Sequence, residues 1–169
     1  NIVDRVVQRA LVLLMEPIYE EKFHDFSHGF RPRKRAVDAA ATVANDCYRL
    51  RQVFDADIEK FFDNVQHSKL VGMIRQDIVD PRVLRLISQM LKSGFQEVGK
   101  SWQASSRGTP QGGPLSPLLA NIYLHYALDE KFAKVTSGRS DVKLVRYADD
   151  FVVLCKHSRQ RPAVERLVR

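Results

Sequence analysis

Two adjacent carboxylates, Asp149 and Asp150, interrupt a stretch of residues that otherwise favours β-strands. The flanking side chains are β-branched, aromatic or aliphatic types that suit a pleated, half-buried surface. They are Val142, Leu144, Val145 and Tyr147 before the pair and Phe151, Val152, Val153 and Leu154 after it. The pattern predicts a hairpin with Ala148 and both aspartates at its tip. Aspartate is also common in turns because its side chain bonds nearby backbone, so the pair by itself is equally compatible with simple turn chemistry.

A third aspartate, Asp57, belongs to a second segment with strand periodicity. Acidic and apolar residues alternate from 53 to 58, which places Asp55 and Asp57 on the face opposite to Phe54, Ala56 and Ile58. A single strand with a polar outer face is unremarkable. Together with the pair at 149 and 150, however, it offers carboxylates from a strand and a hairpin, the oxygen ligands that Mg²⁺ takes along with substrate phosphates.

A glycine-rich loop and a long helix lie between these two acidic segments. Residues 108–115 read Gly-Thr-Pro-Gln-Gly-Gly-Pro-Leu, and Ser116 followed by Pro117 is the pattern of a helix N-terminus. No Gly-Lys-Ser/Thr follows the glycines, so they do not form a phosphate loop of the Walker type. Glycines here would let another backbone or a base pair approach closely. The helix should bury Leu118, Leu119, Ile122, Tyr123 and Tyr126, while Asn121, His125 and Asp129 lie four apart on another face.

The first 52 residues read as helices joined by a loop. A helix capped by Asp4 should kink or break at Pro17. A loop at 27–32 should lead to a helix with Ala36, Val37, Ala40, Ala44 and Cys47 on its buried side. Basic residues crowd the entry of that helix, where they could hold phosphates or simply be solvated; they are Arg31, Arg33, Lys34 and Arg35.

Composition narrows the class of protein. The 169 residues are 44% hydrophobic and 28% charged, as in an ordinary globular domain, and no apolar run is long enough to span a membrane. Cys47 and Cys155 read as buried free thiols. His24 and His28 are four apart, but no cysteine or third histidine stands near them in the sequence, so no zinc site is predicted. The net charge of +7 divides into +2 for residues 1–52, −1 for 53–130 and +6 for 131–169, which suits an acidic centre beside a bound polyanion.

Four segments, in this order, resemble the reverse transcriptases encoded by bacterial group II introns. They are Ser-His-Gly-Phe-Arg-Pro at 27–32, Asp-Ile-Glu-Lys-Phe-Phe-Asp at 57–63, Gln-Gly-Gly-Pro-Leu-Ser-Pro-Leu-Leu-Ala-Asn at 111–121, and Tyr-Ala-Asp-Asp at 147–150. The resemblance implies an α+β fold, the palm of a right-hand polymerase, with a small, mainly antiparallel sheet backed by helices and a helical fingers portion. Residues 1–52 would be mainly fingers and 53–169 mainly palm. The chain would be a fragment that lacks the thumb, maturase and endonuclease regions.

The resemblance also implies an RNA-directed DNA polymerase that serves intron mobility, with an RNA-splicing (maturase) role for the full protein. Asp57, Asp149 and Asp150 would be catalytic, and with Ile58 they would bind two Mg²⁺ ions, for which Mn²⁺ could substitute. Two-metal nucleotidyl transfer requires such a site. The expected partners are an RNA template, a DNA primer, deoxynucleoside triphosphates (dNTPs) and intron RNA, in the bacterial cytoplasm and without a membrane.

Other residues receive roles through the same resemblance. The nucleotide would be bound by Phe62, Arg31, Arg33 and Gln111, and the template-primer by Gly112, Gly113 and Tyr147. Phe62 would stack beneath the deoxyribose and exclude a 2′-hydroxyl, while Phe61 packs inward.

Three alternatives remain open on the sequence. The chain could be a non-catalytic cofactor that binds intron RNA, although its intact aspartates argue against this. It could be an RNA-dependent RNA polymerase, although such enzymes resemble one another in having a small or polar residue where this chain has Phe62. It could also be a reverse transcriptase of bacterial defence or diversity generation, although the 111–117 motif looks more like the intron group.

Overall fold

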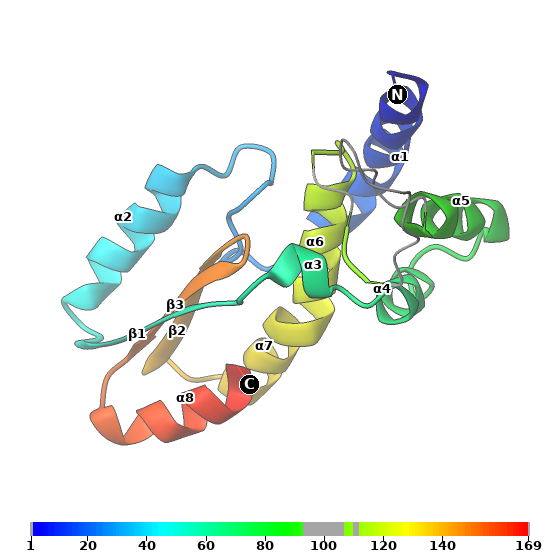
Figure 1. Cartoon of the computed structure of the whole chain (residues 1–169). Helices are drawn as coiled ribbons and strands as arrows, with labels where there is room; N and C mark the ends of the chain where they lie inside the picture. Colours follow the sequence, from blue (N-terminus) through cyan, green and yellow to red (C-terminus); the bar gives the residue numbers. More distant parts are fainter. Residues whose placement is uncertain (1, 93–106, 110–111, 169) are drawn as a thin grey trace, which may run out of the picture. The chain divides into compact units, whose positions relative to one another are not determined.

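The chain folds into two compact units in the computed structural model, which describes residues 2–92, 107–109 and 112–168 (Figure 1). The helical unit comprises residues 1–17 and 60–123. The sheet unit comprises residues 18–59 and 124–169. The predicted catalytic aspartates, Asp57, Asp149 and Asp150, all belong to the sheet unit.

A three-stranded antiparallel sheet forms the centre of the sheet unit. Its strands are β1 (Gln52–Asp57), β2 (Val142–Tyr147) and β3 (Asp150–Cys155), in the spatial order β1-β3-β2. The β2–β3 hairpin has a turn of two residues, because Tyr147 is paired with Asp150. β1 runs antiparallel to β3 from Gln52 opposite Cys155 to Asp57 opposite Asp150. The central strand is therefore the second arm of the predicted hairpin.

Helices pack against both faces of this sheet, one of them only in part. One face packs on α7 (Glu130–Thr136) and α8 (Arg161–Val168) through a continuous apolar core. That core consists of Leu128, Phe132, Val142, Leu144, Phe151, Val153, Cys155 and Val164. Helix α2 (Ala36–Cys47) contacts β2 and β3, and its Asp46 pairs with Lys143, whose side chain alternates to the face opposite Leu144. α2 thus covers the part of the second face that β2 and β3 form, while Val53, Asp55 and Asp57 of β1 are exposed on that face.

A continuous helical stretch from 116 to 136 contains a turn that is not α-helical. It begins with α6 (Ser116–Leu124), passes through a π-helical segment, η1 (His125–Asp129), and ends with α7. In η1 the amide of Glu130 bonds the carbonyl of His125, five residues back. Such π turns contain one more residue than an α turn and are frequent at functional sites.

The helical unit contains the first part of α1 (Ile2–Glu20), then α3 (Phe61–Asn64), α4 (His67–Ile74), α5 (Pro81–Lys92) and α6 as far as Tyr123. α5 shows how sequence sets these helices. Asp80 caps it by accepting from the Arg82 amide at 2.8 Å, Pro81 occupies the first turn, and Leu84, Ile87 and Leu91 form its buried stripe. The short 3₁₀ segment η2 (Ser158–Gln160) precedes α8 in the sheet unit.

The α+β fold predicted from sequence is confirmed, and so is the helix that starts at Ser116. The predicted break at Pro17 does not occur, since helix α1 continues through Pro17 to Glu20, and the alternative, a kink there, stays a prediction. The predicted buried side of α2 is wrong, because α2 buries Ala39 while Ala36, Val37, Ala40 and Ala44 are exposed. The predicted division into fingers (1–52) and palm (53–169) stays a prediction, since the compact units divide the chain elsewhere. No helix among the described residues is both long and apolar enough to cross a membrane.

Candidate active site

Two of the predicted aspartates stand opposite each other at one end of the sheet. Asp57, the last residue of β1, is paired in register with Asp150, the first residue of β3. Side chains of such a cross-strand pair point to the same face, with their Cβ atoms about 4.5 to 5.5 Å apart. Asp55 lies two residues back in β1, on that same face. We call this part of the sheet, with Asp55, Asp57, Asp149 and Asp150, the acidic end.

Asp149 occupies the turn that joins β2 to β3. The turn consists of Ala148 and Asp149, and Ala148 has a φ of +57°. Among the two turn residues only Ala148 has a positive φ, which matches a type II′ turn, where glycine is the usual first residue. A left-handed conformation costs a residue with a Cβ roughly 1 to 2 kcal/mol. The turn that carries Asp149 is therefore strained, and surrounding contacts must hold it.

The electrostatics of the acidic end suit a cation. Burial raises the pKa of the Asp150 carboxyl, and the negative charges of Asp149, Asp57 and Asp55 raise it further. Carboxylates that repel one another in this way are stabilised by a bound divalent ion, and an oxygen-rich donor set suits Mg²⁺. Within the described residues, Asp57, Asp149 and Asp150 are not drawn together into a donor group less than 4.8 Å across.

The segment 26–29 lies directly against the turn. The amide of Arg146 donates to the Phe26 carbonyl, and the amide of His28 donates to the Arg146 carbonyl, both at 2.8 Å. Ser27 thereby forms a short parallel bridge with Arg146 at the edge of β2. A Cβ built on Gly29 would lie 2.2 Å from the Ala148 amide nitrogen. Only glycine fits there, so the 27–32 motif supports the aspartate hairpin through its backbone.

The arginines predicted to bind a nucleotide have different environments. Arg31 is buried; its guanidinium donates to both carboxylate oxygens of Glu20 and to the carbonyls of His24 and Ser27, at 2.8 to 3.2 Å. These bonds tie the 27–32 loop to the end of α1, and a nucleotide-binding role for Arg31 stays a prediction. Arg33 is exposed and has a φ of +59°. Tyr147, predicted to contact template-primer, is 36% exposed at the end of β2.

The predicted sugar gate lies in the helical unit. Phe61 is 5% exposed and packs edge-on against Tyr123, with ring centroids 5.9 Å apart, while Phe62 is only partly buried. The prediction that Phe61 packs inward is confirmed. Phe62 also accepts through its carbonyl a 2.8 Å hydrogen bond from the amide of Thr109. The start of the glycine-rich loop is thus fixed to the backbone of Phe62.

The rest of that loop is partly described. Gly112 has a φ of +81° and open space where a Cβ would be, whereas a Cβ on Gly113 would meet the Gln8 side chain at 2.4 Å. The Gly112 carbonyl faces the Arg5 guanidinium at 3.5 Å. Gln111, predicted to bind the nucleotide, lies outside the described residues.

One cluster was not expected from sequence. His24, His125 and Glu130 bring their donor atoms within 4.8 Å of one another, because the π turn places residues 125 and 130 on one helix face. His125 lies 101 residues from His24 along the chain, so the sequence spacing around His24 and His28 could not indicate this group, and the prediction of no zinc site stays a prediction. His24 bonds Glu130 at 3.0 Å, so this contact is already satisfied as an ion pair when the imidazole is protonated.

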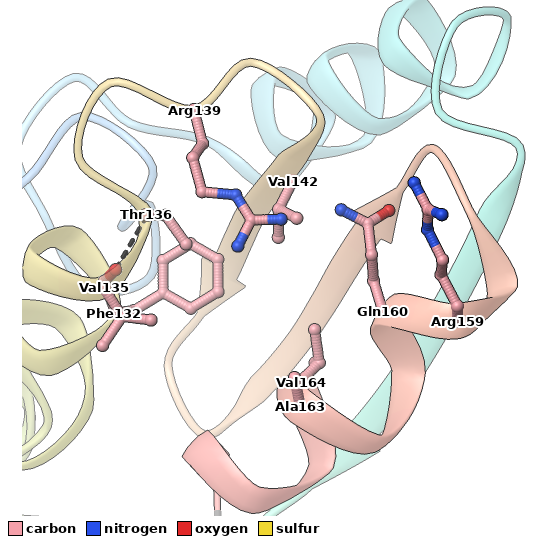
Figure 2. Close-up of a pocket in the computed structure, with 9 residues that line it drawn as sticks. All are labelled: Phe132, Val135, Thr136, Arg139, Val142, Arg159, Gln160, Ala163 and Val164. Carbon is pink, nitrogen blue, oxygen red and sulfur yellow. Dashed lines mark hydrogen bonds between the residues drawn. The ribbon is translucent and has the colours of Figure 1, made fainter.

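A pocket of about 300 Å³ lies elsewhere in the sheet unit, beside α7 and α8 (Figure 2). Its apolar wall includes Phe132, Val142 and Val164, and Arg139 and Arg159 also line it. None of the residues predicted to be catalytic lines it. The pocket lies beside the start of β2, five residues along that strand from Tyr147, so it is separate from the acidic end.

A three-stranded antiparallel sheet with paired aspartates at one end and helices on both faces is the palm of a right-hand polymerase. A solved structure of apo telomerase from Candida tropicalis, truncated from its C-terminal domain, shares this fold. It matches with a TM-score of 0.67 over 96% of this chain and 36% of that chain, at 14% identity.

All 169 residues match one protein family, and the chain belongs to it: the reverse transcriptase (RNA-dependent DNA polymerase) family. The group II intron-encoded protein LtrA of Lactococcus lactis subsp. cremoris is 44% identical over 72% of this chain and 20% of its own length. Protein YkfC of Escherichia coli K12 is 39% identical over 90% of this chain and 48% of its own length. The chain therefore spans less than half the length of either relative.

Proposed function

We propose that this chain carries the catalytic centre of an RNA-directed DNA polymerase, with Asp57, Asp149 and Asp150 as the catalytic residues. The observation that carries the proposal is the register of the sheet. It places Asp57 opposite Asp150 and puts Asp149 in the adjoining turn. Membership of the reverse transcriptase family supports the same reading.

The three carboxylates, with the carbonyl of Ile58, would hold two divalent ions, Mg²⁺ or Mn²⁺. When bound, such ions activate the primer 3′-hydroxyl and neutralise charge on the triphosphate. The protein's part is to present carboxylates from a strand and a turn whose backbones are fixed by the β1–β3 and β2–β3 ladders. The raised pKa of Asp150, due to its burial and to neighbouring carboxylates, supports this arrangement.

The neighbouring motifs would select and align the substrates. Phe62 is proposed to lie under the sugar of the incoming dNTP, where its ring would exclude a 2′-hydroxyl. Gln111 and Arg33 would contact the nucleotide, and Gly112 and Gly113 the template-primer. The open space at Gly112 supports close approach of a partner there. Tyr147 would contact the primer beside the aspartates.

The full protein would act in the mobility and splicing of a group II intron, with intron RNA, an RNA template and a DNA primer as partners. This rests on the similarity to LtrA, a group II intron-encoded protein. The matches in E. coli and L. lactis support a bacterial cytoplasmic setting. The net charge of +7, concentrated in residues 131–169, favours binding of a polyanion.

The test is primer extension on an RNA template by the full-length protein, comparing Asp149→Asn with Asp55→Asn. Both changes remove a carboxylate from the acidic end with little loss of volume. Asp149→Asn should abolish dNTP incorporation, and Asp55→Asn should retain it. Equal activity in the two variants would refute the assignment. A wild-type protein that promotes intron splicing but extends no primer would favour the splicing-cofactor alternative.

A companion experiment examines the sugar gate. Phe62→Ala in the full-length protein should admit ribonucleotides better while keeping measurable dNTP incorporation, because only the ring blocks the 2′-hydroxyl. Unchanged discrimination between the two sugars would remove Phe62 from this role and leave the aspartates unaffected.

A further inference from the structure

Arg146 is an arginine in an apolar position. It lies in β2 on the same face as Val142 and Leu144, opposite Phe151, and is 0% exposed. Strand periodicity predicts a hydrophobic side chain there. Arginine is almost never fully buried unless it is paired, so its partners indicate what it does.

The guanidinium of Arg146 makes bonds to three chain segments. Nε and Nη2 donate to the two carboxylate oxygens of Asp129 at 2.9 and 2.6 Å, and Asp129 is also 0% exposed. Nη2 donates to the Ser27 hydroxyl at 2.7 Å, and Nη1 to the carbonyl of Ala148 at 2.8 Å. The side chain therefore joins η1, the 27–32 motif and the catalytic turn.

A contribution to folding stability does not by itself account for the buried Arg146–Asp129 ion pair. Removing two charges from water costs so much that well-packed apolar residues of similar volume usually serve as well or better. An apolar residue at 146, however, could not donate to the Ala148 carbonyl. That carbonyl belongs to the left-handed residue of the turn, and the next two residues are Asp149 and Asp150. The arginine therefore holds a backbone group of the turn itself.

Asp129, the carboxylate that accepts two bonds from Arg146, comes from an unusual local structure. The guanidinium bonds Asp129, Ser27 and the Ala148 carbonyl at the same time, and Asp129 is the last residue of the π turn. The backbone of Gly29 also packs directly against the amide of Ala148. The turn is thus held from the side chain by Arg146 and from the backbone by residues 26–29.

We infer that Arg146 and Asp129, with Ser27, are positioning residues that orient Asp149 and Asp150 for binding of divalent cations. The inference rests on the proposed function of these aspartates. Groups that orient ligands contribute about 10- to 100-fold to metal affinity or activity when tested by mutation. The three residues touch no substrate; they act through the direction of the Ala148–Asp149 peptide.

The experiment measures Mn²⁺ affinity in the full-length protein by electron paramagnetic resonance of the free ion, without nucleotide, and normalises it to the folded fraction. Asp129→Asn keeps the shape of the side chain and removes its charge. It should weaken Mn²⁺ binding by about 10- to 100-fold. Ser27→Ala removes a single acceptor and is the variant that should fold normally. It should weaken binding by about 3- to 10-fold, the effect of losing one ordinary hydrogen bond.

Asp46→Asn is the matched control. It breaks the Lys143–Asp46 pair, which also joins β2 to a helix but lies near the other end of the strand. It should leave Mn²⁺ affinity within about twofold of wild type, since additivity holds for distant sites. Arg146→Lys keeps the positive charge but loses the forked guanidinium, so its Mn²⁺ affinity should be below that of the wild type.

Two results separate this inference from the proposed function. If Ser27→Ala and folded Asp129→Asn bind Mn²⁺ as wild type does, the positioning role is overturned, whatever the polymerase activity. If Mn²⁺ affinity falls as expected but the wild-type protein extends no primer, the positioning role stands and the polymerase assignment fails. If Asp46→Asn weakens binding as much as Asp129→Asn, the effect is a general loss of sheet stability and the inference is wrong.

Discussion

A methyl group at residue 29 should displace the turn that carries Asp149. In Gly29→Ala the new Cβ would lie 2.2 Å from the Ala148 nitrogen and 2.9 Å from both the Ala148 Cα and the Tyr147 carbonyl carbon. These are backbone atoms, so no side chain can swing aside. Ordinary van der Waals contact begins at 3.4 Å, whereas the new Cβ and the Ala148 nitrogen would be 2.2 Å apart. One of the two groups must therefore move by about 1.2 Å.

That shift has two measurable consequences. Overpacking of this kind costs about 1 to 3 kcal/mol, which should appear as a lower midpoint of thermal or denaturant unfolding. Displacement of reacting groups by about 1 Å costs on the order of 100-fold in rate, so primer extension by the full-length protein should fall by more than stability alone explains. The hairpin is the part expected to move, because the three atoms nearest to the new methyl group all belong to its backbone.

Gly72→Ala is the matched control. Gly72 lies within α4, and nothing stands within 4 Å of a Cβ built there. Alanine in a helix is favoured over glycine by about 0.8 to 1 kcal/mol, so this variant should be more stable than wild type and equally active. A Gly29→Ala protein with wild-type stability and wild-type primer extension would refute the reasoning, since the backbone would then have to accommodate the methyl group at no cost.

Three further outcomes follow from the structure. Phe61→Ala should lower the free energy of unfolding by about 3 to 5 kcal/mol, as loss of a buried ring does, and chemical denaturation should show a smaller loss for the partly buried Phe62→Ala. The hydrogen bond from Arg139 lowers the pKa of Asp141 to about 2, so this carboxylate stabilises the fold above pH 4 and the benefit disappears as the pH falls toward 2. Asp141→Asn should therefore lower the melting temperature at pH 7, and the difference from wild type should vanish near pH 2; a constant difference would contradict this. Asp150→Asn, melted at pH 7 in a metal chelator, should be more stable than wild type, because burial and neighbouring carboxylates raise the pKa of Asp150 and penalise its charged form; a lower melting temperature would count against that repulsion.

The sheet and its acidic end were predictable because their signals are local. Alternation from 53 to 58 predicted β1 and the face of Asp57, and the apolar runs around 149 and 150 predicted the hairpin. The turn is one residue shorter than expected, since Asp150 already belongs to β3. A period of two fixes which side chains share a face, but it does not fix which strand lies in the middle; that depends on long-range pairing.

The buried face of α2 was mispredicted for a different reason. Alanines are spread around this helix, so periodicity gave no sharp apolar stripe. The position of the sheet decided that Ala39 is buried, together with the pairing of Asp46 with Lys143. Tertiary contacts outweighed a weak local pattern.

Arg146 and Arg31 show what a single sequence hides. Arg31 was interpreted as a solvated or phosphate-binding charge, and Arg146 received no role from the sequence. The partners of both are a helix carboxylate and backbone carbonyls that local patterns cannot connect. Ser27 lies 119 residues from Arg146 along the chain, and Asp129 lies 17 away in a turn whose π geometry no residue type announces. The helical periodicity of Asn121, His125 and Asp129 was the available signal, and all three are buried.

The π turn makes residue number, as well as residue type, a constraint on this chain. In an α-helix each residue advances the face by 100°. Deletion of one residue between 125 and 129 would leave a regular helix. The side chains from Asp129 to Phe132 would then be rotated by about 100° relative to His125. Either His125 or these later side chains would have to leave their present positions. Insertions and deletions are tolerated in surface loops, but here a single one would separate either the Arg146 partner or the core ring of Phe132 from its site. We therefore expect length variation among close relatives of this chain to avoid residues 125–132, however freely the side chains on the exposed face change.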